Sequence, residues 1–277
     1  MAFHSRNNNG ILRKLFGRNE DPELTEVFRE KGFYSDEYVN AFKARRQKLS
    51  SDDHFTLCEI YTEMERYDDA QSELLSVKAG SILDDITTGQ RAFCRIAIAF
   101  GTGKYEDALR VYEELGRFLD TFMKNPVRSR VAGDYYFYSA ALCAMFTDED
   151  AKKAQPSATE KALASFMGTS PTGVNSEKLE KYLARLREWC DIYPKHRILY
   201  DITEVAVLFA KSKANTDSGD TTEINEGVRN VAYRKEAEDA AAKCRQNILD
   251  FSGFKYEWER EYYLRKLDRA TRLTHAA

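Results

Sequence analysis

The run Gly101-Thr102-Gly103-Lys104 has the composition of a phosphate-binding loop. Such a loop needs an earlier glycine five residues before its second glycine, and a Ser or Thr directly after the lysine. Those two places hold Ile98 and Tyr105. The residues before the run also carry a helical pattern, whereas a phosphate loop follows a strand. We therefore interpret the run as a turn between two helices.

The residues that could perform catalysis or hold a metal are scattered. No two histidines have metal-ligand spacing, and the odd number of cysteines includes no Cys-x-x-Cys pair. Adjacent carboxylates such as Asp68/Asp69 and Glu113/Glu114 point away from each other on a helix, so they do not form an acid–base pair. The histidines are His4, His54, His196 and His275, and the cysteines are Cys58, Cys94, Cys143, Cys190 and Cys244. We expect no catalytic residue, no cofactor and no metal.

The composition is that of a globular, water-soluble chain. Apolar residues make up 43% of the 277 residues and charged residues 31%, with a net charge of −3. A near-neutral chain has no general field that attracts nucleic acid. Met1–Gly10 lacks the apolar core of a signal peptide, and no apolar run approaches the roughly 18 residues of a membrane span. Unpaired cysteines fit a reducing compartment, so we expect a cytoplasmic protein.

One short pattern occurs twice and indicates how the chain is organised. Tyr67-Asp68-Asp69-Ala70 returns 38 positions later as Tyr105-Glu106-Asp107-Ala108. Two apolar pairs keep the same spacing, Leu74 with Tyr112 and Val77 with Leu115. A period of 20 to 50 residues is typical of stacked-repeat proteins.

Each copy of the pattern predicts a helical hairpin with a tyrosine packed at its turn. The apolar positions have helical spacing, and Ala70 and Ala108 are small where the two helices of each hairpin must approach closely. The leading helices carry Leu57, Cys58 and Tyr61 in the first hairpin and Ile96, Ala97 and Phe100 in the second. Because these sets are offset by 39 rather than 38 positions, we expect the second turn to be one residue shorter.

Over residues 52–118 this arrangement resembles the tetratricopeptide repeat family. The positions Leu57, Cys58, Tyr61, Ala70, Leu74 and Val77 match that family's large–small–aromatic and small–large–small pattern. The resemblance implies antiparallel hairpins stacked in a right-handed α-solenoid, whose leading helices line a concave surface that grips an extended peptide. The 38-residue period exceeds the family's 34, and no proline closes either unit, so the joint between repeats must differ.

The remaining sequence extends the helical pattern on both sides. We expect an all-α chain of ten to twelve helices, with a disordered or amphipathic segment at residues 1–20 and one helical-repeat domain at 21–277. Its repeats become degenerate over 130–277, where the half after the repeats is irregular. Further helices are predicted at Asp21–Glu30, Asp36–Leu49, Tyr135–Met145, Ala162–Phe166, Ser176–Tyr193, Ile198–Lys211, Val228–Phe251 and Lys255–Leu273, with polar segments at Thr147–Ser157 and Asn215–Gly227.

The candidate binding site lies on the leading helices, opposite their buried stripe. In the resembled family these positions line the peptide groove. The side chains there are Phe55, Glu59, Glu63, Arg91, Arg95 and Ile98. The surface would be acidic on the first hairpin and basic on the second, with two apolar anchors. The Lys and Asn clamp for a terminal carboxylate is absent, which argues against binding of chaperone tails. We predict a non-catalytic adaptor that holds a peptide or helix of a partner protein.

Two alternatives remain at this point. Leu12, Leu15 and Phe16, interleaved with Arg and Lys over Ile11–Arg18, could tether a peripheral membrane adaptor, or could cap the stack or dock on a partner. Four apolar residues bury too little for attachment on their own. An all-α enzyme with a lid at Asn215–Gly227 is less favoured. The basic run Lys43–Lys48 is explained by the favourable charge at a helix C-terminus.

Overall fold

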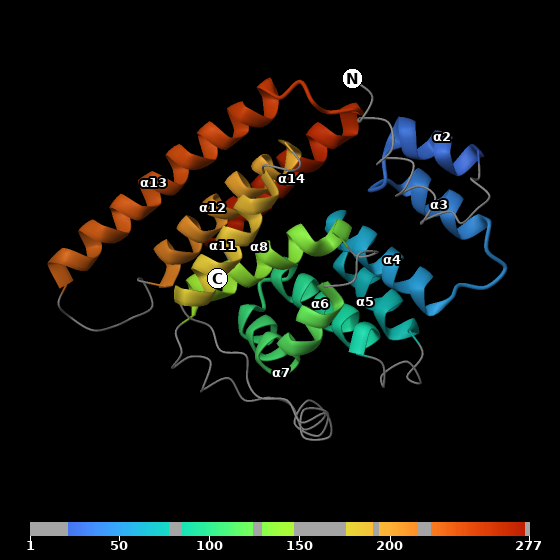
Figure 1. Cartoon of the computed structure of the whole chain (residues 1–277), viewed down its shortest axis with the longest axis horizontal. Helices are drawn as coiled ribbons and strands as arrows, with labels where there is room; N and C mark the ends of the chain where they lie inside the picture. Colours follow the sequence, from blue (N-terminus) through green and yellow to red (C-terminus); the bar gives the residue numbers. More distant parts are fainter. Residues whose placement is uncertain are drawn as a thin grey trace.

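The computed structural model describes residues 22–77, 85–123, 129–146, 176–190, 194–214 and 223–274. Within these residues the chain forms eleven α-helices and one short 3-10 helix, and no strand is present in them. The helices pack in neighbouring pairs, which confirms the predicted all-α, solenoid-like fold (Figure 1). None of the described helices is both long and apolar enough to cross a membrane.

The N-terminal half consists of three consecutive helical hairpins. Their helices are α2 (Pro22–Lys31), α3 (Asp36–Ala44), α4 (Ser51–Glu63), α5 (Tyr67–Ser76), α6 (Asp85–Gly101) and α7 (Tyr105–Met123). Helix α4 begins at a capping box, in which the Ser50 side chain accepts from Asp53 N and the Asp53 carboxylate accepts from Ser50 N. Ala70 and Ala108 are fully buried, as expected where the paired helices approach closely. The two predicted hairpins, α4–α5 and α6–α7, are confirmed.

The two hairpin turns have the same construction. Each spans three residues, and each places a left-handed residue at the same position, Glu65 (φ 59°) and Gly103 (φ 72°). In each turn the following residue donates its backbone N–H to a carbonyl five positions earlier, Arg66 to Tyr61 and Lys104 to Ala99, both at 2.8 Å. The prediction of a shorter second turn was therefore wrong. Helix α6 is buried on nearly all sides from residue 92 to 100, so its apolar residues can be aligned with those of α4 in more than one way. The 39-position offset was one such alignment and did not measure the length of the turn.

The tyrosines of the repeat pack at the turns, as predicted. The Tyr67 ring lies so close to Gly101 that a Cβ atom there would overlap it. Tyr105 packs edge-on against Phe100, with ring centroids 5.4 Å apart. A glycine at the end of α6 therefore lets the first hairpin's tyrosine reach the second hairpin, which joins the repeats without the closing proline that the sequence lacks.

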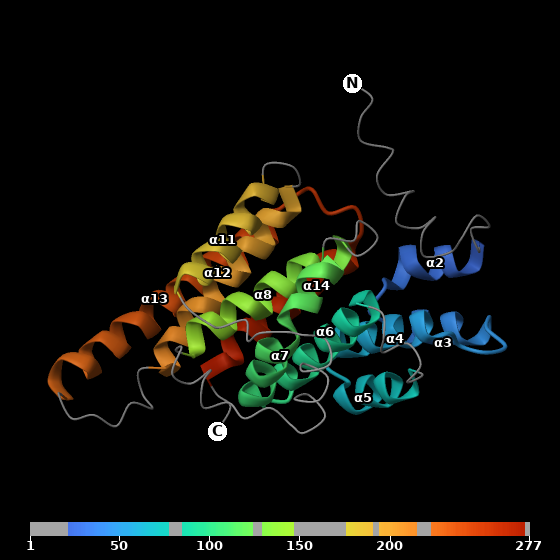
Figure 2. The ribbon, with the colours of Figure 1, turned by 60° about the horizontal axis from the view of Figure 1, so that its bottom comes forward.

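The C-terminal half is a bundle rather than a series of similar hairpins, in line with the predicted irregularity. Its helices are α8 (Ser129–Met145), α11 (Ser176–Cys190), α12 (Pro194–Ala214), α13 (Glu223–Asp250) and α14 (Glu257–Thr271), followed by the 3-10 turn Arg272–Thr274. Helix α12 packs against α8, α11, α13 and α14. In Figures 1 and 2, α14 runs from the end near α2 back along α12, beside the hairpins. Helix α14 packs against α12 and α13, and its buried residues are Lys266, Leu267, Arg269 and Ala270.

Several predicted boundaries shift. Helix α3 ends at Ala44 rather than Leu49. Pro194 begins α12, where a proline suits the first helical position, and the predicted end of the preceding helix at Tyr193 lies outside the described residues. Helix α13 begins at Glu223, so the end of the expected polar segment Asn215–Gly227 is helical. The segment 1–20 and the predictions at Asp21, Ala162–Phe166 and Thr147–Ser157 lie outside the described residues.

Candidate functional site

Four of the six predicted groove residues are buried within the chain. The exposed fractions are 1% for Phe55, 7% for Glu59 and Glu63, and 8% for Ile98. Arg91 and Arg95, which lie on α6, are half-buried. The expectation that these side chains line an open groove was therefore wrong for the four buried residues. Whether any of the six contacts a partner stays a prediction.

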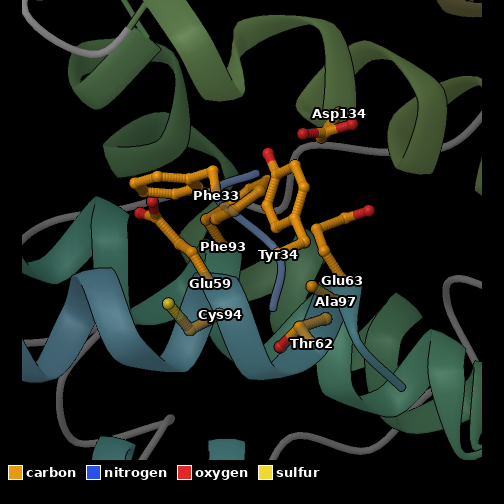
Figure 3. A pocket seen from close by; sticks show the side chains of 9 residues that line it. All are labelled: Phe33, Tyr34, Glu59, Thr62, Glu63, Phe93, Cys94, Ala97 and Asp134. Carbon is orange, nitrogen blue, oxygen red and sulfur yellow. The ribbon is translucent and has the colours of Figure 1, made fainter. Parts of the chain in front are cut away.

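The leading helices are covered by two segments that are distant in sequence. Between α2 and α3, the side chains of Phe33 and Tyr34 lie over α4, and Asp134 approaches from α8 (Figure 3). The space left among them is about 10 Å³, room for about one water molecule. The cavity is lined by Phe33, Tyr34, Glu59, Thr62, Glu63, Phe93, Cys94, Ala97 and Asp134. In this protein the inner surface of the hairpins is an interface within the chain.

Two of the predicted residues instead connect the first hairpin to the second. Gln90 of α6 donates from its side-chain amide to Glu59 Oε1 of α4 at 3.2 Å. Arg91 Nη2 donates to the carbonyl oxygen of Val77 at 3.4 Å. Burial lowers the pKa of the Arg91 guanidinium, since its Nε is enclosed without a hydrogen-bond acceptor among the described residues.

Beneath α14 lies a cluster of four buried charged side chains, which we call the charge cluster: Glu63 from α4, Asp134 from α8, and Lys266 and Arg269 from α14. Lys266 Nζ lies 3.5 Å from Glu63 Oε1, and Arg269 Nη1 lies 3.3 Å from the same oxygen. Lys266 also forms an ion pair with Asp134. The Lys266 side chain is only 1% exposed and that of Asp134 10%. Two carboxylates balance two cations, so the cluster is neutral as a whole.

Arg269 also caps the C-terminal end of α4. Its Nη2 donates to the carbonyl oxygens of Thr62 and Glu63, each at 3.2 Å. The last carbonyls of a helix have no partner within the helix, and a cation near them interacts favourably with the helix dipole. Next along the chain, the left-handed Glu65 pairs with Arg269 and Arg272. Helix α14 thus holds both the end of α4 and the strained residue of its turn.

The two acids of the cluster differ in their pKa. Burial alone would raise the pKa of Glu63, but Arg269 and Lys266 outweigh burial and lower it. Burial raises the pKa of Asp134, and the charge of Glu63 adds to this effect against the opposing Lys266. For Lys266, the carboxylates of Asp134 and Glu63 outweigh burial and raise the pKa. Two cations favour the ionised form of Glu63, whereas burial favours the protonated form of Asp134.

Aromatic contacts fasten the start of α14 to the α2–α3 hairpin. Tyr262 stacks on Tyr34 with ring centroids 4.7 Å apart, and Trp258 meets Phe28 edge-on at 5.3 Å. Trp258 lies directly over Gly32, where a Cβ atom would come within 2.6 Å of the indole ring. Gly32 also has a left-handed backbone (φ 84°), so both space and conformation favour glycine there.

The sequence pointed to one member of the charge cluster, Glu63, and missed the other three. A signal was present, because Lys266 and Arg269 alternate with Leu267 and Ala270 on the apolar stripe of the last helix. Charged residues among buried positions indicate a buried ion pair, but their partners are more than 130 residues away. Among the described residues no group of His, Cys, Asp and Glu side chains could hold a metal ion. The cluster joins helices and encloses no volume for a small-molecule substrate.

The fold and this interface define a helical-repeat protein in which a bundle packs against stacked hairpins. Residues 32–129 match the family of the coatomer epsilon subunit. The matched segment is 98 of the 277 residues, about a third of the chain, and it contains helices α3 to α7. The chain matches no curated protein and no solved structure.

This match supports the coarser predictions. A helical-hairpin repeat and a non-enzymatic role as a protein-interaction scaffold are both compatible with a subunit of a coat complex. The tetratricopeptide family itself is not named by the match, so that resemblance stays a prediction. The membrane or partner contact assigned to Leu12, Leu15 and Phe16 falls outside the described residues and also stays a prediction.

Proposed function

We propose that this chain is a non-catalytic scaffold subunit of a protein assembly and that its stacked hairpins hold a peptide or helix of a partner. The observation that carries the proposal is the overlap of the coatomer epsilon subunit match with the repeat hairpins. The matched family is by name a subunit of a larger complex, and the matched residues are those that build the repeats. The protein would act in the cytoplasm, where coat assembly would bring it close to a membrane surface.

Burial divides the predicted contact residues into two groups. Phe55, Glu59, Glu63 and Ile98 support the hairpins from within. The half-buried Arg91 and Arg95 lie four residues apart, on one face of α6, and carry charge to the edge of the surface. We assign the contact with an acidic segment of the partner to these two arginines.

Affinity capture from lysate with the intact chain, read by mass spectrometry, tests the proposal. We expect stoichiometric co-purification of a defined set of assembly subunits. An Arg91→Glu/Arg95→Glu variant should lose them, whereas Arg185→Glu, an exposed charge reversal on α11, should retain them. Circular dichroism must show that all three chains are folded. Retention of the same subunits by the double variant would reject the assignment to α6, and capture of no subunit by the wild-type chain would reject the scaffold function.

A further inference from the structure

We infer that the face of α2 carrying Val27 is a docking site for residues 11–16 of the same chain, which would fold back on it as a short basic helix and cover the open end of the hairpin stack. The inference goes beyond the proposed function, because it concerns a contact within the chain and holds whichever partner the hairpins bind. It rests on the position of α2, on the charges along it and on the pattern of the residues that precede it.

Helix α2 lies at the end of the hairpin stack. In Figures 1 and 2 it is on the far side of α3 from α5. Among the described helices it packs mainly against α3, and Phe28 meets Trp258 at the start of α14. Val27 and Phe28 are only partly buried. The end unit of a stack of repeats has no neighbouring unit on one side, so a further element is needed to cover its apolar residues.

An acidic strip runs along α2 beside Val27. Glu23, Glu26 and Glu30 are all exposed, and their spacing of three and four residues places them on one face of the helix. Glu23 pairs with Arg45, whereas Glu26 and Glu30 make no ion pair within the described part of the chain. Like charges four residues apart repel each other, so a cation held beside Glu26 and Glu30 would stabilise α2.

The residues just before α2 have the complementary pattern. Leu12, Leu15 and Phe16 are spaced i, i+3 and i+4, which places them on one face of a helix. Arg13 and Lys14 lie between them in sequence and therefore beside that face, and residues 11–18 contain no acidic side chain. The apolar face fits the partly buried residues of α2, and the two cations fit its acidic strip.

The connection to α2 is short enough to favour docking within the chain. Five residues separate Phe16 from Pro22, and antiparallel helices are commonly joined by two to five residues. Gly17 directly follows the last apolar residue, at the place where glycine commonly ends a helix. A short tether also gives the segment a high effective concentration at α2, so three apolar side chains are enough there although they are too few for stable attachment to a membrane.

Hydrogen exchange of the full-length chain, followed by mass spectrometry, tests the apolar part of the contact. The variant Leu12→Ser/Leu15→Ser/Phe16→Ser should exchange its α2 amides about tenfold faster than wild type, because a helix without its covering contacts opens more often. The amides of α6 and α7 should keep their wild-type rates, which shows that the rest of the chain is folded. The control variant His4→Ser/Arg6→Ser/Asn7→Ser changes three polar residues outside the apolar pattern and should match wild type.

A charge exchange tests the acidic strip. Glu26→Lys/Glu30→Lys should speed exchange of the α2 amides, and adding Arg13→Glu/Lys14→Glu to the same chain should restore their protection. A loss of intrinsic helix stability would not be rescued by changes in another segment. The control Glu177→Lys/Glu180→Lys reverses two exposed acids on α11 and should leave α2 unchanged.

The remaining outcomes would overturn the inference. Wild-type α2 exchange in the apolar variant, or no rescue by the reversed charges, would show that residues 11–16 do not cover α2. If the wild-type chain binds phosphatidylserine vesicles and the apolar variant does not, with α2 exchange unchanged, the segment contacts a membrane instead. Protection of α2 that grows with protein concentration would assign the docked segment to a second copy of the chain.

Discussion

The charge cluster makes a quantitative prediction about the ion pair between Lys266 and Asp134. We consider a double-mutant cycle in which Lys266→Met and Asp134→Leu are made separately and together. Methionine keeps most of the length of the lysine stem, and leucine is close in size to aspartate. Each single change leaves a charge buried without the partner it contacts, whereas the double change removes both.

The expected magnitudes follow from burial. Because the Lys266 side chain is 1% and that of Asp134 10% exposed, removing one partner should cost about 3–5 kcal/mol of unfolding free energy. Lys266 keeps Glu63 as a second partner, so Asp134→Leu should lie at the lower end. The double variant should be within about 1 kcal/mol of wild type, since apolar packing replaces the pair. The coupling energy of the cycle, the sum of the two single losses minus the double loss, is then about 5 kcal/mol or more.

Urea unfolding followed by circular dichroism at 222 nm measures all four chains. A matched cycle on the exposed pair of Arg185 and Glu188, whose side chains are 56% and 60% exposed, should give about 0.2–1 kcal/mol. Thermal midpoints should fall by about 10 °C in the Lys266→Met chain. A coupling energy for the buried pair no larger than that of the exposed pair would refute the argument, because it would show that water reaches the cluster.

Three further predictions concern the hairpins. Gly101→Ala should lower unfolding free energy by about 1–3 kcal/mol, because the new methyl group overlaps Tyr67, and Tyr67→Ala in the same chain should recover part of that loss in urea titrations. Gly103→Ala should lower the free energy of unfolding by about 1–2 kcal/mol, because this position has a left-handed backbone. Glu65→Gly relieves similar strain but removes the ion pairs of Glu65 with arginine, so the thermal midpoint of this variant relative to wild type should rise with salt. The lowered folded-state pKa of Glu63 contributes stability that is lost as pH falls below about 4.5 and through that pKa. Glu63→Gln removes this contribution, so urea titrations across pH should show a smaller loss of unfolding free energy in acid than in wild type.

The hairpins could be predicted from the sequence because their determinants are local. The 38-residue spacing, the small Ala70 and Ala108, and the tyrosines at the turns all act within one hairpin or between neighbours. The turn length was mispredicted for a physical reason. Because α6 is buried on almost every side, its apolar residues have no unique alignment with those of α4. The two turns share a left-handed residue after the leading helix. In the α4–α5 hairpin this residue is Glu65, although such a position favours glycine.

The candidate site could be predicted only in part, because its partners come from the far end of the chain. Helical periodicity places Glu59 and Glu63 opposite the stripe that faces α5, and that much is local. Periodicity does not say whether water, a partner or another part of the chain covers the second face. Here the α2–α3 turn covers it at Tyr34, and α14 covers it at Lys266. A helix face with charged residues suggests solvent exposure when only the sequence is known, because the oppositely charged partners are distant along the chain.

The contact between α14 and the hairpins distinguishes this chain from a simple peptide-binding stack. A buried apolar contact would have sealed the hairpins against the bundle with no demand on the chemistry of the sealing helix. Aromatic side chains make part of this contact, but at its centre Glu63 and Asp134 face Lys266 and Arg269. Arg269 adds the requirement that the partner reach the last carbonyls of α4. Helix α14 meets both demands with one face, on which Lys266 and Arg269 lie three residues apart.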